Sequence, residues 1–267
     1  MISKLRQFDA KAPAVVIDIG NTSVNIATWH ADQVKTPLSA GTADQPEIQA
    51  ALAAHYDAMP KGHTPATVIA SVVPDTTKRI GEYVQTTLDR DVLVIGDAIP
   101  LPMDVAVTDK QAIGVDRVCA AFAAYDKLQA ACTVVDFGTA VTVDLVDDEG
   151  ILLGGAILAG LKMQLRALNE QTAVLPSDVA PAFPDLPYGR DTVEAMQTGA
   201  CRGLAGAVRG LVEAYASYLN RWPQVVATGG DLALMAPYCD YLDTQVNHLT
   251  LRGIGRAYSQ HLAAHGA

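Results

Sequence analysis

Two short acidic glycine turns are the segments of this sequence best suited to chemistry. They read Asp18-Ile-Gly-Asn-Thr22 and Asp136-Phe-Gly-Thr-Ala140, and each stands between two apolar or alternating runs, the pattern of a β-hairpin. Glycine at Gly20 and Gly138 permits a positive φ angle and lets backbone amides approach a phosphate closely. One such turn alone is common between the strands of a β-hairpin and does not by itself indicate a binding site. Two turns with the same order of residues predict sites that grip a nucleoside triphosphate and its metal.

Both turns carry polar groups as well as glycine. Asp18 and Asp136 stand at predicted strand ends, where their carboxylate oxygens could hold a hydrated cation. The neighbouring residues Asn21, Thr22 and Thr139 supply polar hydrogens at the rim of each turn. Phosphate and cation binding are therefore expected at the same two places.

A third charged site lies at the start of an alanine-rich helix predicted over residues 114–125. Asp116 is open to two interpretations. It is a helix-start carboxylate favoured by the helix dipole, with Arg117 paired on the surface. Alternatively, it is a general base that accepts the proton of an attacking hydroxyl, while Arg117 anchors an anionic or amide-bearing acceptor.

The elements that must position these groups alternate between helix and strand, which predicts an α/β fold. We expect helices near 45–56 and 78–88, and strands at 67–73, 92–95, 151–157 and 225–228. A capping-box pattern at Asp191 opens a long helix, and Asp144, Asp147 and Asp148 are expected at a solvated hairpin end. The apolar stripe of the long helix predicts core packing or a subunit interface: Val193, Met196, Ala200, Leu204, Ala207, Leu211 and Tyr215.

Composition excludes several classes of protein. The 267 residues are 50% hydrophobic with a net charge of -10, and no basic stripe suits a nucleic acid. No apolar run is long enough for a membrane span or a secretory signal. The four cysteines form no CxxC pair and fit buried thiols in a reducing cytoplasm. P-loop, GxGxxG, GxSxG and paired-histidine zinc motifs are missing from the sequence.

Eight ordered motifs resemble those of type III pantothenate kinases, and the resemblance extends from about residue 14 to 256. They are Asp18-Ile-Gly-Asn-Thr22, Ser71-Val-Val-Pro74, Gly114-Val-Asp-Arg117, Asp136-Phe-Gly-Thr-Ala140, Gly154-Gly-Ala-Ile157, Thr172-Ala-Val-Leu-Pro176, Thr192 with Met196-Gln-Thr-Gly199, and Thr228-Gly-Gly-Asp231. The resemblance implies an actin-like, sugar kinase and heat-shock ATPase fold with duplicated α/β domains and ATP between them. It also implies transfer of the ATP γ-phosphate to pantothenate, the first step of coenzyme A biosynthesis.

The resemblance also assigns roles by position. The first phosphate loop would comprise Asp18, Ile19, Gly20, Asn21, Thr22, Ser23, Val24 and Asn25, with Asp18 near Mg²⁺. Asp136 would bind K⁺ or NH₄⁺, and Gly138, Thr139, Gly229 and Gly230 would serve ATP. Pantothenate would be held by Gly114, Val115, Asp116 and Arg117, with Asp116 as the base. Thr192 would contact pantothenate of the other subunit of a homodimer.

The implied organisation is an extension over residues 1–12, a first actin-like domain over 13–120, and a second over 121–267 with the dimer-forming helices. Three features depart from the family pattern. Asn25 stands where many members have lysine, residues 105–110 replace an aromatic residue and an Asn-Pro pair, and Ala159 stands where proline is usual before Gly160. The second departure keeps two alternatives open: a nucleotide-sensing regulator without catalysis, and a kinase for another small hydroxyl compound.

Overall fold

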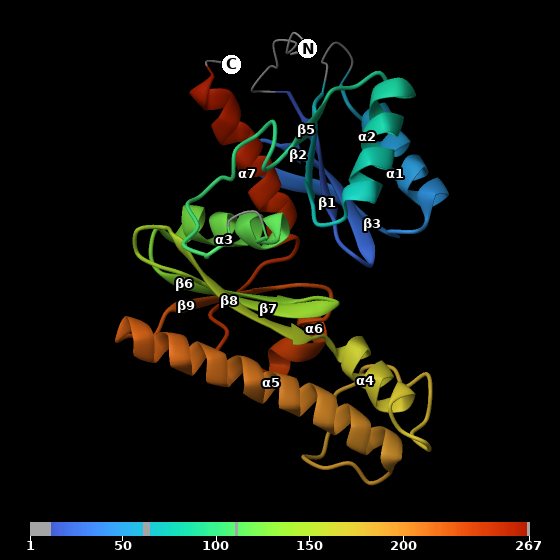
Figure 1. Ribbon diagram of the computed structural model, residues 1–267, viewed down its shortest axis with the longest axis vertical. Coiled ribbons are helices and arrows are strands. Elements are labelled where there is room, and N and C mark those ends of the chain that lie inside the picture. Colours follow the sequence, from blue (N-terminus) through green and yellow to red (C-terminus); the bar gives the residue numbers. More distant parts are fainter. Residues whose placement is uncertain (1–11, 61–64, 110–111, 266–267) are drawn as a thin grey trace. The chain divides into compact units, whose positions relative to one another are not determined.

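The computed structural model describes residues 12–60, 65–109 and 112–265 (Figure 1). Residues 1–11 of the predicted extension lie outside the described residues. The chain divides into two compact units. The first unit comprises residues 1–126 together with 248–267, and the second unit comprises residues 127–247.

The first unit is built on a five-stranded sheet in the order β3-β2-β1-β4-β5. Its strands are β1 (Ala14–Ile19), β2 (Ser23–His30), β3 (Gln33–Gly41), β4 (Thr67–Ser71) and β5 (Val92–Val94). The central strand β1 pairs antiparallel with β2 and parallel with β4. The hairpin predicted around the first acidic turn is confirmed.

Helices cover both faces of this sheet. On one face lie α1 (Gln45–Asp57) and α2 (Pro74–Thr86), which pack on Ile17 and its neighbours. On the other lie α3 (Val115–Leu128) and α7 (Leu249–Ala264), which pack on Val16 and Trp29. Because residues alternate between faces along a strand, β1 is apolar at nearly every position.

The second unit repeats this plan. Its strands are β6 (Cys132–Phe137), β7 (Ala140–Val146), β8 (Leu152–Ala159), β9 (Gln224–Thr228) and β10 (Thr244–Gln245). The sheet order is β10-β9-β6-β7-β8, and β6 pairs antiparallel with β7 and parallel with β9. The two sheets therefore share one pairing scheme, which confirms the duplicated α/β fold.

One face of the second sheet holds a core with α4 (Leu161–Glu170), α5 (Thr192–Leu219) and α6 (Leu232–Met235). A short 3₁₀ helix, η1, follows at Ala236–Tyr238. In Figure 1, α5 runs along this sheet and extends past it beside α4. Among the described residues, no helix combines the length and apolarity needed to cross a membrane.

The C-terminal helix α7 joins the first unit, whereas the sequence placed the whole of 121–267 in the second domain. Its residues Leu251, Ile254 and Tyr258 are buried against the first sheet. The approach is close, because a Cβ on Gly255 would lie 2.1 Å from the Trp29 ring. This pairing joins residues more than two hundred positions apart, so local sequence patterns carry no sign of it.

One prediction about exposure was wrong, and the core face of one helix differs in part from the predicted stripe. Asp144 was expected in a solvated hairpin end, but it lies within β7 and is 1% exposed. The predicted stripe of α5 is also shifted, since Val193 and Ala207 are exposed and Met196, Ala200 and Leu204 are buried. The core face is completed instead by Cys201, Ala205, Val208 and Val212. Small residues on several sides of the helix make its apolar periodicity weak.

Candidate active site

The first acidic turn joins β1 to β2 and is held by hydrogen bonds from the chain after β3. Gly20 N–H donates to the Ser23 carbonyl at 2.9 Å, and the Thr42 hydroxyl donates to the Gly20 carbonyl at 2.9 Å. Thr42 N–H donates to the Thr22 carbonyl at 3.0 Å. Thr42 thus fixes the turn, and sequence reasoning missed it because it belongs to a separate segment.

Gly20 and Gly138 do not use the positive φ that glycine permits, since neither is among the described residues with positive φ. At Gly138 the constraint is one of space: a Cβ would lie 3.2 Å from the Ala140 carbonyl and 3.3 Å from Asp136 Oδ1. At Gly20 the nearest atom is 3.4 Å away, an ordinary contact. Asn21 and Thr22 are exposed at the rim of the first turn, as predicted.

Asp18 lies opposite Asn25 in the β1–β2 hairpin. The Asn25 amide donates to Asp18 Oδ2 at 3.1 Å, and Asp18 Oδ1 is buried. The pair ends the sheet face whose other members, including Val16 and Ala27, are buried against α3 and α7. The carboxylate is therefore carried on the rigid end of a central strand.

Asp116 stands in the first turn of α3 and folds back over the helix start. Its Oδ1 accepts a hydrogen bond from Arg117 N–H at 2.8 Å. Gly114 makes room for this arrangement, because a Cβ there would lie 2.4 Å from Asp116 Oδ1. The helix-start interpretation of Asp116 thus describes its present geometry. The bond uses one carboxylate oxygen, so a base role remains compatible with it.

Asp18 and Asp116 both act electrostatically on one buried thiol, that of Cys119 on α3. Burial raises the pKa of Cys119, and the negative charges of Asp18 and Asp116 raise it further. Cys119 packs in the same core as Val16 of β1, which places α3 over the end of the sheet that carries Asp18. Two predicted site carboxylates therefore share one electrostatic environment within the first unit.

The second acidic turn joins β6 to β7 and lies beside the loop that follows β9. Because β6 and β9 are parallel, Asp136 is level with Thr228, and Gly229 follows directly. Gly229 has a φ of 107°, and a Cβ there would lie 2.4 Å from the Phe137 carbonyl. Asp231 N–H donates to that same carbonyl at 2.9 Å. The predicted nucleotide residues of the second unit are thus brought together.

The fit of these carboxylates to a metal depends on the ion. Within the described residues, no group of three or more His, Cys, Asp or Glu side chains could hold one. Mg²⁺ is commonly held by one or two carboxylates together with water and substrate phosphates. The hard oxygen atoms of Asp18 suit such a shared site.

Thr192 is the first residue of α5 and is exposed. Asp191 caps the helix by accepting from Glu194 N–H at 2.8 Å. The reciprocal half of the predicted capping box is displaced by one residue, because Glu194 accepts from Arg190 N–H. The pair with Arg190 lowers the pKa of Glu194 to about 2. Within the second unit, these contacts hold the helix start at which Thr192 lies.

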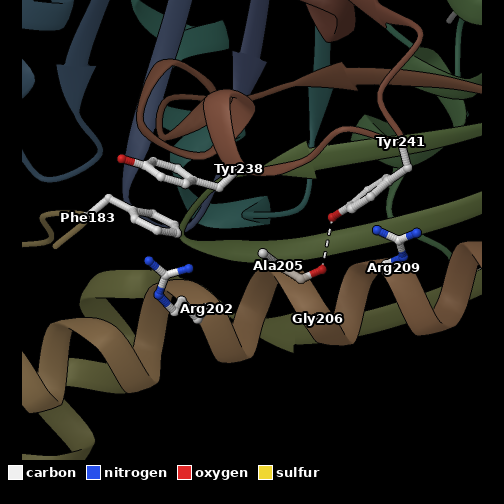
Figure 2. Close-up of a pocket in the computed structure, with 7 residues that line it drawn as sticks. All are labelled: Phe183, Arg202, Ala205, Gly206, Arg209, Tyr238 and Tyr241. Carbon is white, nitrogen blue, oxygen red and sulfur yellow. Dashed lines mark hydrogen bonds between the residues drawn. The ribbon is translucent and has the colours of Figure 1, made fainter. Parts of the chain in front are cut away.

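A cavity of about 260 Å³ opens beside α5, and it contains none of the predicted site residues (Figure 2). Its arginines already have partners within the chain. Arg209 pairs with Glu213 and Asp240, each at 3.0 Å, and Arg202 lies over the Phe183 ring. Its lining comprises Phe183, Arg202, Ala205, Gly206, Arg209, Tyr238 and Tyr241. The geometry does not favour a phosphate site here.

Comparison with solved structures supports the fold. A protein described as a Baf family transcriptional activator from Campylobacter jejuni is 18% identical, with a TM-score of 0.59 over 92% of this chain and 98% of that one. A ROK family glucokinase from Streptomyces griseus is 13% identical, with a TM-score of 0.50 over 91% and 98%. An archaeal actin homologue is 11% identical, with a TM-score of 0.50 over 92% and 99%. The predicted actin-like fold is confirmed.

Comparison of sequences supplies the family. The model of the type III pantothenate kinase family matches residues 14–214. A type III pantothenate kinase of Thermomicrobium roseum is 33% identical over 92% of this chain and 96% of its own length. One of Rhodospirillum rubrum is 32% identical over 90% and 95%. This chain therefore belongs to the type III pantothenate kinase family.

Proposed function

We propose that this protein transfers the γ-phosphate of ATP to the primary hydroxyl of pantothenate, the first step of coenzyme A biosynthesis. The observation that carries the proposal is that Asp18 at the end of β1 and Asp116 at the start of α3 belong to one unit, in which α3 packs on the sheet through Cys119, in a chain of this family. Phosphoryl transfer requires positioned reactants, cations on the phosphates and a carboxylate for the nucleophile. The first unit offers the carboxylates.

In this proposal Asp116 is the catalytic base. It takes the proton of the pantothenate hydroxyl as the oxygen attacks the γ-phosphorus and ADP leaves. Asp116 Oδ1 is engaged with Arg117 N–H at 2.8 Å, a bond that orients the carboxylate. Arg117, beside it, anchors the acceptor, and Gly114 and Val115 complete the acceptor segment. Asp18 and the loop to Asn25 serve the phosphates, and Mg²⁺ held near Asp18 would neutralise their charge.

The second unit supplies further groups for the nucleotide. Thr139 is exposed at the tip of the second acidic turn, where its hydroxyl can meet a ligand. Gly138, Gly229 and Gly230 present backbone close by. We assign the monovalent cation, K⁺ or NH₄⁺, to Asp136, whose carboxylate stands at the end of β6. A cation held there would offset charge on the bound phosphates.

We also propose a homodimer formed through α5. Four glycines, Gly199, Gly203, Gly206 and Gly210, recur at spacings of three and four on the exposed side of this 28-residue helix. A Cβ at any of them would have no neighbour within 4 Å. Each glycine weakens a helix interior by about 1 kcal/mol relative to alanine. In a dimer, these glycines would let a second backbone approach closely, which offsets this cost.

The unit that carries α5 also carries most of the exposed large apolar side chains. Of the eleven large ones among the described residues, ten lie in the second unit and only Leu38 lies in the first. Exposed apolar area of this kind marks interaction surfaces. Thr192, at the start of α5, would then reach pantothenate bound to the partner. The ten are Ile157, Met163, Leu168, Val174, Leu186, Tyr188, Val193, Tyr218, Trp222 and Tyr238.

All four cysteines are free and buried, as predicted, and we propose that the enzyme works in the cytoplasm. The test of function is incubation of the protein with ATP, Mg²⁺, K⁺ and pantothenate, followed by mass spectrometry. We expect phosphopantothenate in equal amount to ADP. If the protein phosphorylates another alcohol of a test panel and does not phosphorylate pantothenate, that alcohol replaces pantothenate as the proposed substrate. Nucleotide binding without any product would indicate a regulator and contradict the proposal.

A further inference from the structure

We infer that Asn25 is a positioning residue for Asp18, which it holds with a neutral donor so that the carboxylate keeps its full charge for a divalent cation bound with the nucleotide. The inference rests on the proposed function and gives Asn25 a specific part in it. Asn25 would act on the metal ligand, and the phosphates would be contacted by other groups of the loop.

The first argument is geometric. Asp18 and Asn25 are directly opposed across the β1–β2 hairpin, with Asn25 Nδ2 3.1 Å from Asp18 Oδ2. Cross-strand neighbours of this kind are held at fixed separation by the backbone ladder. The amide donor is therefore presented by the sheet itself. It restricts rotation of the carboxylate without help from a flexible side chain.

The second argument concerns the setting of the pair. The cross-strand pair that precedes it on the same face of the sheet, Val16 with Ala27, is apolar and fully buried. Asp18 Oδ1 is itself buried. In such a place, directional hydrogen bonds fix the orientation of a carboxylate. Asn25 supplies one such bond, from its amide to Asp18 Oδ2.

The third argument concerns charge. A cationic side chain at position 25 would lie beside Asp18 and offset its negative charge, which would weaken the attraction between Asp18 and a metal ion. An amide donates a hydrogen bond and adds no charge. Groups that orient a metal ligand in this way typically change metal affinity by about 10- to 100-fold when they are removed. Metal affinity is therefore the property that Asn25 should control.

The experiment measures binding of Mn²⁺, a paramagnetic substitute for Mg²⁺, to the full chain in the presence of ATP and without pantothenate. Free Mn²⁺ is followed by electron paramagnetic resonance. Asn25→Leu removes the donor and keeps a side chain branched at Cγ, and we expect Mn²⁺ affinity to fall by about 10-fold or more. Asn25→Lys keeps a donor but adds charge, and we expect a similar loss. The lysine variant also serves if the leucine variant fails to fold.

Ser39→Ala is the matched control. Ser39 lies opposite Asn25 on its other side, on the edge strand β3, and is exposed. We expect its Mn²⁺ affinity to equal that of the wild type. Affinity within twofold of the wild type in a folded Asn25 variant would overturn the inference. Because pantothenate is omitted, failure of the wild type to phosphorylate pantothenate would refute the proposed function alone.

Discussion

The exposed glycines of α5 give a prediction whose sign depends on whether a second copy covers them. In the isolated chain, Gly203 and Gly206 have open space where a Cβ would stand. Replacing both by alanine should stabilise the monomer by about 2 kcal/mol, because each glycine costs about 1 kcal/mol in a helix interior. In a dimer with close backbones, the same methyl groups enter occupied space. Overpacking costs about 1–3 kcal/mol, so the dimer dissociation constant of the double variant should rise by about 10-fold or more.

The assay is sedimentation equilibrium, which gives the dimer dissociation constant, together with urea unfolding of the variant at concentrations where it is monomeric. Gly81→Ala is the matched control, because Gly81 lies in α2 of the first unit and also has nothing within 4 Å. We expect that control to gain about 1 kcal/mol and to dimerise as the wild type does. A double variant with unchanged dissociation, or a monomeric wild type, would refute the reasoning.

Two other perturbations test local parts of the structure. Burial lowers the pKa of His55 from its ordinary 6.5, so its neutral form is favoured in the folded state and protonation favours unfolding. The free energy of unfolding of the wild type should therefore fall as pH drops below 6.5, and that of His55→Gln should fall less. Equal pH dependence in the two proteins would exclude His55 as the cause. Gly160→Ala places a Cβ 2.4 Å from the carbonyls of Gly138 and Thr139. We expect it to lose about 1–3 kcal/mol of stability and to raise the KM for ATP, whereas Gly230→Ala, with nothing within 4 Å, should keep its stability.

The sequence was a good guide wherever the signal was local. Alternation around two glycine turns predicted both hairpins, and Asp191 marked the start of α5. The placement of Asp18 opposite Asn25 follows from the hairpin register and could have been worked out from the turn. Strand ends and turns therefore carry most of the predictable part of the candidate site.

Features that depend on distant contacts were not predictable. The packing of α7 on Trp29 joins opposite ends of the chain, and Thr42 reaches the first turn from beyond β3. Asp144 is a polar residue in an alternating strand, which predicts an outward position unless that face is buried too. The convergence of Asp18 and Asp116 on Cys119 also requires α3 to be docked on the sheet.

The measurement that tests the central claim most directly is the turnover of Asp116→Asn with ATP and pantothenate, beside its dissociation constant for ATP. Asparagine keeps the oxygen that accepts from Arg117 N–H, so the start of α3 should be preserved. General base catalysis contributes about 10²–10⁴-fold to rate, and we predict a loss of kcat of that size with ATP affinity unchanged. An Asp116→Asn enzyme with the turnover of the wild type would contradict the account.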